Sequence, residues 1–97
     1  MKTKPLKIKQ EIINILKKHD ICHAAIFGSF ATGEAREDSD LDILIEFGAA
    51  KKKTLLDLAS LKIELEELSG RTVDIVEYSA IYPPLRDRIL REQEVLM

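Results

Sequence analysis

Short apolar runs alternate with amphipathic segments along this chain, and this alternation strongly limits the folds that it can adopt. Apolar residues at three- and four-residue spacing predict helices, whereas short apolar runs between turn signals predict buried strands. In chain order, the predicted elements are a helix at 5–18, a strand at 21–27, a short helix or turn within 29–39, a strand at 41–47, a helix at 54–68, a strand at 72–76 and a helix opened by Pro83-Pro84. The order α-β-α-β-α-β-α predicts an α/β (α+β-like) fold.

The lengths of the connections predict the directions of the strands. The long helix at 54–68 suits a right-handed crossover between parallel strands, while the short segment 29–39 suits an antiparallel pair. The expected sheet is therefore small, mixed and three-stranded. A chain of 97 residues is expected to form a single domain over residues 1–97.

Charge and composition exclude several classes of function. The 15 Lys and Arg residues against 17 Asp and Glu residues leave a net charge of −2, which argues against a pure nucleic-acid binder. No apolar run approaches the roughly 20 residues that a membrane span needs, and the first residues lack a signal-peptide core. Because the single Cys22 cannot form an intramolecular disulfide, the expected location is cytoplasmic.

Two aspartates at the start of the second strand carry the sharpest chemical signal. Asp40 and Asp42 are two residues apart, so their carboxylates point to one face and repel each other unless a cation lies between them. Carboxylate oxygens beside phosphates are typical of an Mg²⁺ site. The alternative is that Ser39-Asp40 forms only a solvated turn. A calcium loop is excluded, because Ile43 and Ala49 stand where it needs Gly and Glu.

Two further features complete a candidate site. Gly28-Ser29 follows a strand, and its backbone N–H groups and hydroxyl can hold an anion such as phosphate, although the same dipeptide is a common turn. Asp74 interrupts the β-formers of the third strand, so it is expected to be partly buried. If that strand lies beside the second, Asp74 reaches the other two carboxylates. Such a cluster beside a phosphate-holding turn predicts metal-assisted phosphoryl or nucleotidyl transfer.

These residues resemble the signature of the nucleotidyltransferase superfamily that includes DNA polymerase beta. Gly28-Ser29, Gly33, Ser39-Asp40-Leu41-Asp42 and a later acid on a strand follow its G-S…G…S-D-x-D…D pattern. The resemblance covers nearly the whole chain, whose small size is similar to that of the minimal members, the MNT-domain proteins. It implies the nucleotidyltransferase fold.

The resemblance also implies roles for the matching residues. Asp40 and Asp42 would ligate two Mg²⁺ ions, one of which bridges the nucleoside triphosphate. Asp74 would complete the second metal site and help to deprotonate the attacking hydroxyl. The reaction would be in-line attack on the α-phosphate of ATP, with pyrophosphate leaving. Gly28 and Ser29 would hold the β- and γ-phosphates, and Ser39 would shape the turn before Asp40.

Minimal stand-alone members of the resembled family typically pair with a helical HEPN-domain partner, often as antitoxin to that toxin. The implied function is therefore AMP transfer from ATP to a tyrosine of a HEPN toxin, within a complex of the two proteins. Two alternatives remain open: neutralisation of the partner by contact, and a sensor that binds nucleotide and Mg²⁺ without transfer.

Many family members carry a basic residue near the position of Thr32. In this chain Arg36 or the lysines at 51–53 would have to supply that positive charge instead.

The remaining candidate residues predict structure rather than chemistry. Cys22 is predicted to be a buried, small apolar residue. His19 and His23 span a helix end and a strand, which argues against a shared metal site. The apolar residues 95–97 suit either packing of the tail or contact with a partner.

Overall fold

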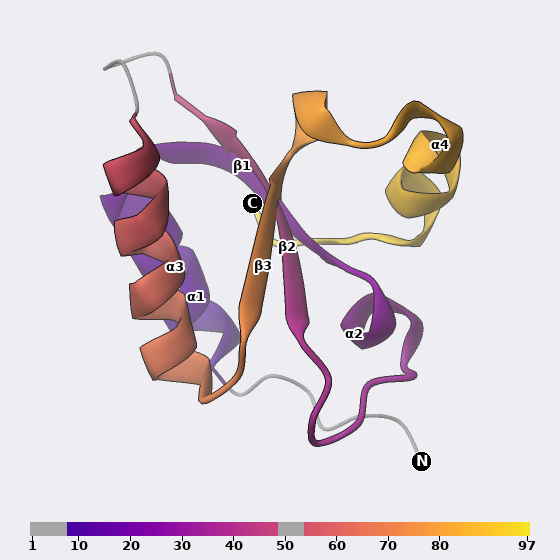
Figure 1. Cartoon of the computed structure of the whole chain (residues 1–97), viewed down its shortest axis with the longest axis horizontal. Helices are drawn as coiled ribbons and strands as arrows, with labels where there is room; N and C mark the ends of the chain where they lie inside the picture. The colour runs from indigo at the N-terminus through magenta and orange to yellow at the C-terminus, as the bar shows by residue number, and fades with distance from the viewer. Residues whose placement is uncertain (1–7, 49–53) are drawn as a thin grey trace.

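The computed structural model describes residues 8–48 and 54–97. Its helices and strands alternate as the sequence predicts, and both β1 and β2 have the predicted bounds (Figure 1). The lysines at 51–53, which the sequence offered as a substitute for a basic residue near Thr32, lie outside the described residues. In chain order the elements are α1 (Lys9–Lys18), β1 (Ile21–Phe27), α2 (Ser29–Thr32), β2 (Leu41–Phe47), α3 (Leu55–Ser69), β3 (Val73–Glu77), the 3₁₀ turn η1 (Tyr78–Ala80), α4 (Pro83–Glu92) and β4 (Glu94–Val95).

The described strands form one mixed sheet in the order β3-β2-β1-β4. As predicted, β1 pairs antiparallel with β2, and β2 pairs parallel with β3. The predicted count of three strands is wrong, because β4 pairs with β1 on its other side. With only two residues, β4 is too short to produce a periodic pattern. The backbone N–H of Leu96 continues the pairing to the carbonyl of Ala24 at 2.8 Å, so this part of the tail packs against the sheet.

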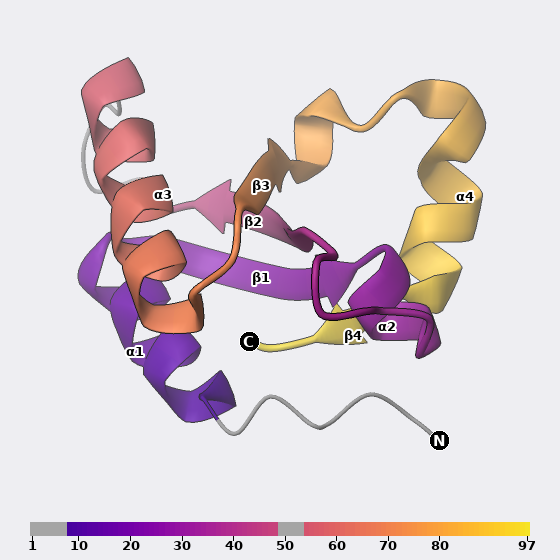
Figure 2. The same cartoon turned by 60° about the horizontal axis from the view of Figure 1, so that its bottom comes forward.

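Helices cover the two faces of the sheet unequally. Figures 1 and 2 show α1 and α3 side by side on one face, with α4 on the opposite side. The larger core lies under α1 and α3, while a smaller cluster of Ala25, Leu44 and Ile81 lies under α4 and η1. The buried residues of the larger core are Ile12, Leu16, Ile21, Ala24, Ile26, Leu41, Ile43, Ile45, Leu61, Leu65 and Val73.

The ends of α3 are defined by specific residues. Thr54 caps the start of the helix in a reciprocal capping box with Asp57. Gly70 ends the helix in the left-handed conformation, with φ of 68°, as the Ser69-Gly70 pair predicts. The leucine spacing of this helix also predicts an apolar stripe that begins at Leu55, but Leu55 is 84% exposed, because it lies at the helix start beyond the edge of the core. No helix within the described ranges has the length and apolarity needed to cross a bilayer.

A polar contact ties the end of α3 to the start of β3. The carboxylate of Glu66 accepts hydrogen bonds from the Val73 backbone N–H at 2.9 Å and from the Lys62 ammonium at 2.8 Å. These bonds lower the pKa of Glu66, the Lys62 contact having the larger effect. Because they anchor the first residue of β3, they help to set β3 beside β2, where the candidate site lies.

Candidate active site

The structure brings the three predicted aspartates to one end of the β2–β3 pair. Asp42 and Asp74 are register partners on these parallel strands, and neighbouring strands lie about 4.8 Å apart. Asp40 stands two residues before Asp42, on the loop that enters β2. The pKa of Asp42 is raised by burial first, and then by the negative charges of Asp74 and Asp40. The three carboxylates therefore interact through their charges.

This cluster has the donor chemistry of a site for a hard divalent cation. A cation would offset the repulsion that raises the pKa of Asp42, and oxygen ligands of this kind suit Mg²⁺. Asp74 is exposed rather than partly buried, because β3 lies at the edge of the sheet. The carboxylate oxygens of the three aspartates do not all lie within 4.8 Å of one another. Within the described part of the chain, that spacing is reached by the ligand atoms of a different group of three residues.

Gly28 lies directly against Asp42. Its φ of 73° and ψ of −149° belong to a region that only glycine adopts readily. A Cβ atom at this position would overlap Oδ2 of Asp42 and lie 3.2 Å from its Cγ. The α2 helix begins at the next residue, Ser29, so the missing side chain lets β1, α2 and the Asp42 carboxylate meet closely.

Ser39 lies in the turn that leads to Asp40. Its hydroxyl accepts a hydrogen bond from the Arg36 backbone N–H at 2.7 Å. Arg71, which no sequence pattern marks, holds this turn from outside. The Nη1 atom of Arg71 lies 3.0, 2.9 and 3.0 Å from the carbonyl oxygens of Arg36, Glu37 and Ser39. Its guanidinium also lies 4.7 Å from the ring centroid of Phe30, in α2.

Arg71 therefore links three parts of the site: α2, the turn before Asp40, and the segment that enters β3. No local signal in the sequence points to this role. An arginine after a helix-ending glycine is typical of a surface position, and its carbonyl partners lie 32 to 35 residues away in the chain.

For the nucleotidyl transfer from ATP that the family resemblance implies, replacing Arg71 with lysine or alanine is expected to lower kcat about 10- to 100-fold, by analogy with residues that orient metal ligands. A lysine keeps the positive charge but lacks the planar guanidinium that contacts both these carbonyl groups and the Phe30 ring, so the Asp40 turn loses its support. The KM for ATP should change less than kcat, and more Mg²⁺ should be needed for half-maximal rate. Arg91→Ala, an exposed change in the last turn of α4, is the matched control. A fall in Tm with unchanged kcat would show that Arg71 serves only the fold.

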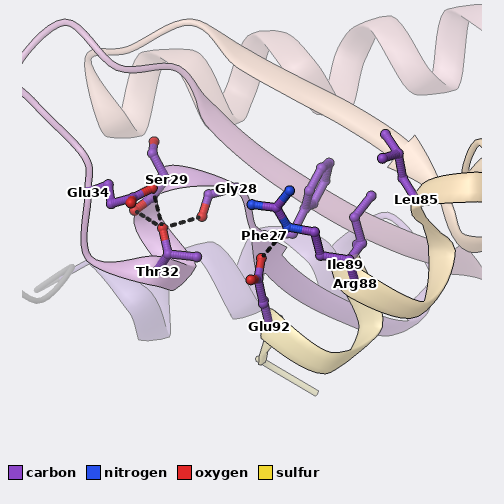
Figure 3. A pocket seen from close by; sticks show the side chains of 9 residues that line it. All are labelled: Phe27, Gly28, Ser29, Thr32, Glu34, Leu85, Arg88, Ile89 and Glu92. Carbon is purple, nitrogen blue, oxygen red and sulfur yellow. Dashed lines mark hydrogen bonds and ion pairs between the residues drawn. The ribbon is translucent and has the colours of Figure 1, made fainter.

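A pocket of about 270 Å³ opens beside Gly28 and Ser29 (Figure 3). Phe27, Leu85 and Ile89 give it an apolar wall. The sequence pattern of the last helix predicts that Leu85 points inward, but Leu85 is 46% exposed because it borders this opening. None of the three aspartates lines the pocket, which adjoins their cluster through Gly28. The remaining lining residues are Ser29, Thr32, Glu34, Arg88 and Glu92.

Arg88 contributes a positive charge to this pocket, where Thr32 contributes none. The sequence analysis named Arg36 instead, but that residue is outside the pocket lining and its carbonyl oxygen contacts Arg71. Arg88 Nε lies 3.5 Å from Glu92 Oε1 one helical turn away, as Figure 3 shows. Because this ion pair is exposed and therefore weak, the positive charge of Arg88 remains available to a ligand.

Comparison with known proteins agrees with this geometry. The family model described as polymerase beta nucleotidyltransferase matches residues 10–97. A Methanocaldococcus jannaschii protein, provisionally named a protein adenylyltransferase, is 55% identical over 86 residues, covering 89% of this chain and 90% of that protein. The protein adenylyltransferase MntA of Thermococcus cleftensis is 36% identical over 91 residues, covering 86% of this chain and 90% of that protein.

Solved structures share the fold. A structure provisionally described as a minimal nucleotidyltransferase is 45% identical, has a TM-score of 0.75, and covers 88% of this chain and 85% of that one. A tri-AMPylated Shewanella oneidensis HEPN toxin in complex with an MNT antitoxin gives a match with a TM-score of 0.67 at 20% identity, over 92% of this chain and 68% of that one. The aspartate cluster, the glycine beside it and these matches together show that the chain belongs to the polymerase beta nucleotidyltransferase family.

Proposed function

We propose that this protein transfers AMP from ATP to a hydroxyl group of a protein partner, and that the partner is a HEPN-type toxin. The observation that carries the proposal is the position of Asp42, which is packed on Gly28 and faces Asp74 across the β2–β3 pair. Relatives named protein adenylyltransferases support AMP as the transferred group. The matching complex of an MNT antitoxin with an AMPylated HEPN toxin supports the choice of partner.

In this proposal the three aspartates hold Mg²⁺, as their donor chemistry allows. When bound, two such ions would offset the negative charge of the triphosphate and of the departing pyrophosphate. The acceptor oxygen forms a bond to the α-phosphorus, and the bond from that phosphorus to the bridging oxygen breaks. Asp74 is exposed at the sheet edge, where it can accept the proton of an incoming protein hydroxyl.

The pocket beside Gly28 suits the rest of the nucleotide. Its apolar wall of Phe27, Leu85 and Ile89 offers a surface for one face of the base. Gly28 and Ser29 both line the pocket and Gly28 lies against Asp42, so in this proposal a triphosphate that extends from the pocket to Asp42 passes the Gly28 backbone and the Ser29 hydroxyl. Arg88 then supplies the positive charge that the family pattern places near Thr32.

Replacing Arg88 with alanine is expected to raise the KM for ATP about tenfold, which corresponds to about 1.4 kcal/mol of binding free energy. Because the charge acts on bound ATP before and during transfer alike, kcat should change little. Arg91→Ala, on the same helix but outside the pocket lining, should leave both constants unchanged. A steady-state titration of ATP makes the comparison, and an unchanged KM in Arg88→Ala would remove this residue from the nucleotide site.

Neutralisation by contact is a second candidate, favoured by an apolar surface on α3. Leu55, Leu56 and Ile63 are 84%, 80% and 54% exposed, which is unusual for three large apolar side chains on one helix. Such a surface suits a protein contact whether or not AMP is transferred.

The deciding experiment incubates the protein with α-labelled ATP, Mg²⁺ and a candidate HEPN partner protein, and then measures the intact mass of both proteins. A gain of one or more AMP units on the HEPN protein is expected, and it should be absent with Asp42→Asn. Asp87→Asn, an exposed change in α4, is the matched control and should act like the unaltered protein. Toxin inhibition without any mass gain would favour contact alone, and Mg²⁺-dependent ATP binding without either effect would favour a sensor.

A further inference from the structure

A second group of metal-ligating side chains lies outside the aspartate cluster, on β1 and β2. Cys22, His23 and Glu46 each offer one ligand atom, and these three atoms all lie within 4.8 Å of one another. All three side chains are exposed. Cys22 was predicted to be buried. A register shift between Ile21 and His23 explains both its exposure and its position beside His23 and Glu46.

A β-bulge near the start of β1 places Cys22 and His23 together. Ile21 pairs with Phe47 and His23 pairs with Glu46, so two steps along β1 oppose one step along β2. In a regular strand, neighbouring side chains point to opposite faces, and one of these two would be buried. The extra residue in the bulge breaks the alternation, and both side chains reach solvent while Ile21 and Ala24 remain buried.

The pairing of the strands also supplies the third ligand. Glu46 is the register partner of His23, and the Cys22 Sγ atom lies 3.4 Å from the Glu46 carbonyl oxygen. Metal–ligand bonds of about 2.0–2.3 Å imply about 3.3–3.8 Å between ligand atoms of a tetrahedral site. The observed grouping within 4.8 Å reaches that geometry by small rotations of exposed side chains, with the backbone held by the sheet.

We propose that Cys22, His23 and Glu46 form a site for a transition-metal ion of the Zn²⁺ class, bound by three protein ligands and one water. A thiolate and an imidazole select Zn²⁺ or Co²⁺ over Mg²⁺, which prefers oxygen ligands alone. Glu46 is four residues from Asp42 on β2, a separation of about 13 Å along a strand. The site is therefore separate from the aspartate cluster in both position and preferred metal, and it does not depend on the proposed AMP transfer.

The test is a titration of metal-free protein with Co²⁺ in a reductant that does not bind metals. With excess Mg²⁺ present to occupy the aspartate cluster, the expected result is one Co²⁺ per chain, a sulfur-to-cobalt charge-transfer band in the near ultraviolet, and displacement of the Co²⁺ by Zn²⁺. Cys22→Ser should abolish the charge-transfer band, and His23→Gln or Glu46→Gln should weaken binding at least tenfold. Since all three residues are exposed, circular dichroism should show the variants folded.

Two controls locate the ion. His19→Gln, whose ring contacts Glu64 at 2.6 Å, and Asp42→Asn should both retain the cobalt spectrum. Zn²⁺ should also slow alkylation of Cys22, with less protection in His23→Gln. Absence of Co²⁺ binding, a spectrum unchanged in Cys22→Ser, or loss of the spectrum in Asp42→Asn would overturn the proposal. One ion per two chains would likewise overturn it, because the ligands would then come from different copies.

Discussion

Replacing Asp42 with asparagine is expected to lower the proposed AMP transfer at least about 10³-fold, since loss of about 4 kcal/mol of transition-state stabilisation has that effect on rate. Asparagine has nearly the same shape as aspartate but lacks the charge that a divalent cation requires. Asp42 lies at the centre of the cluster, against Gly28 and between the charges of Asp40 and Asp74. Single-turnover transfer from α-labelled ATP measures the loss.

The same substitution is expected to stabilise the metal-free protein at neutral pH. Burial and the neighbouring carboxylates raise the pKa of Asp42 in the folded state above its ordinary value of 3.8. Below that value the carboxyl is protonated in both states, and no penalty exists. As the pH rises through the raised pKa, ionisation costs more in the folded protein than in the unfolded one, so stability is lost.

Thermal unfolding at several pH values without divalent ions tests this effect. The Tm of Asp42→Asn should exceed that of the unaltered protein at pH 7, and the difference should shrink as the pH falls towards 3.8. The gain should stay below about 1 kcal/mol, because the side chain is partly solvated. A variant that is less stable at neutral pH and still transfers AMP would contradict both expectations.

Replacing Gly28 with alanine is expected to damage both the fold and the activity. The φ of 73° with ψ of −149° costs a non-glycine residue about 1–3 kcal/mol. In a domain of this size each kcal/mol lowers the Tm by about 4–8 °C. The new methyl group would also overlap the Asp42 carboxylate and push it away from Asp74. AMP transfer should therefore fall further than the stability loss explains, as measured at a temperature where the variant is fully folded.

Two variants separate backbone strain from the clash. Gly33→Ala adds a methyl group at φ of 82° with nothing within 4 Å, so it should show strain without displacing Asp42. In an Asp42→Ala background the overlapping carboxylate is absent, and Gly28→Ala should then cost less stability than in the unaltered protein. Equal costs in the two backgrounds would mean that strain at Gly28 explains the whole effect.

The sequence predicted those elements and residues whose signals are local. Apolar runs define β1 and β2 to the residue, Gly28 ends β1, and the glycine at position 70 ends α3. The spacing of Asp40 and Asp42 placed both at the entrance to one strand. The length of the connection before β3 then predicted a parallel neighbour, and the observed β2–β3 pairing brings Asp74 beside Asp42.

Other features depend on contacts between distant segments, and no local pattern predicts them. The two residues of β4 form a strand only because β1 offers a free edge. Asp74 is exposed because no strand among the described residues covers β3 on its outer side. Cys22 is exposed because the register with β2 shifts between Ile21 and His23.

The sequence by itself therefore determined the order of elements and the identity of the acidic cluster, because periodicity and residue spacing act over a few neighbouring positions. Only the tertiary structure decided which groups support that cluster. Arg71 reaches the turn before Asp40, and Arg88 reaches the pocket beside Ser29, across long stretches of chain. Such contacts arise from the packing of α3, α4 and the sheet, because folding brings together side chains whose separation in sequence carries no information about their distance in space.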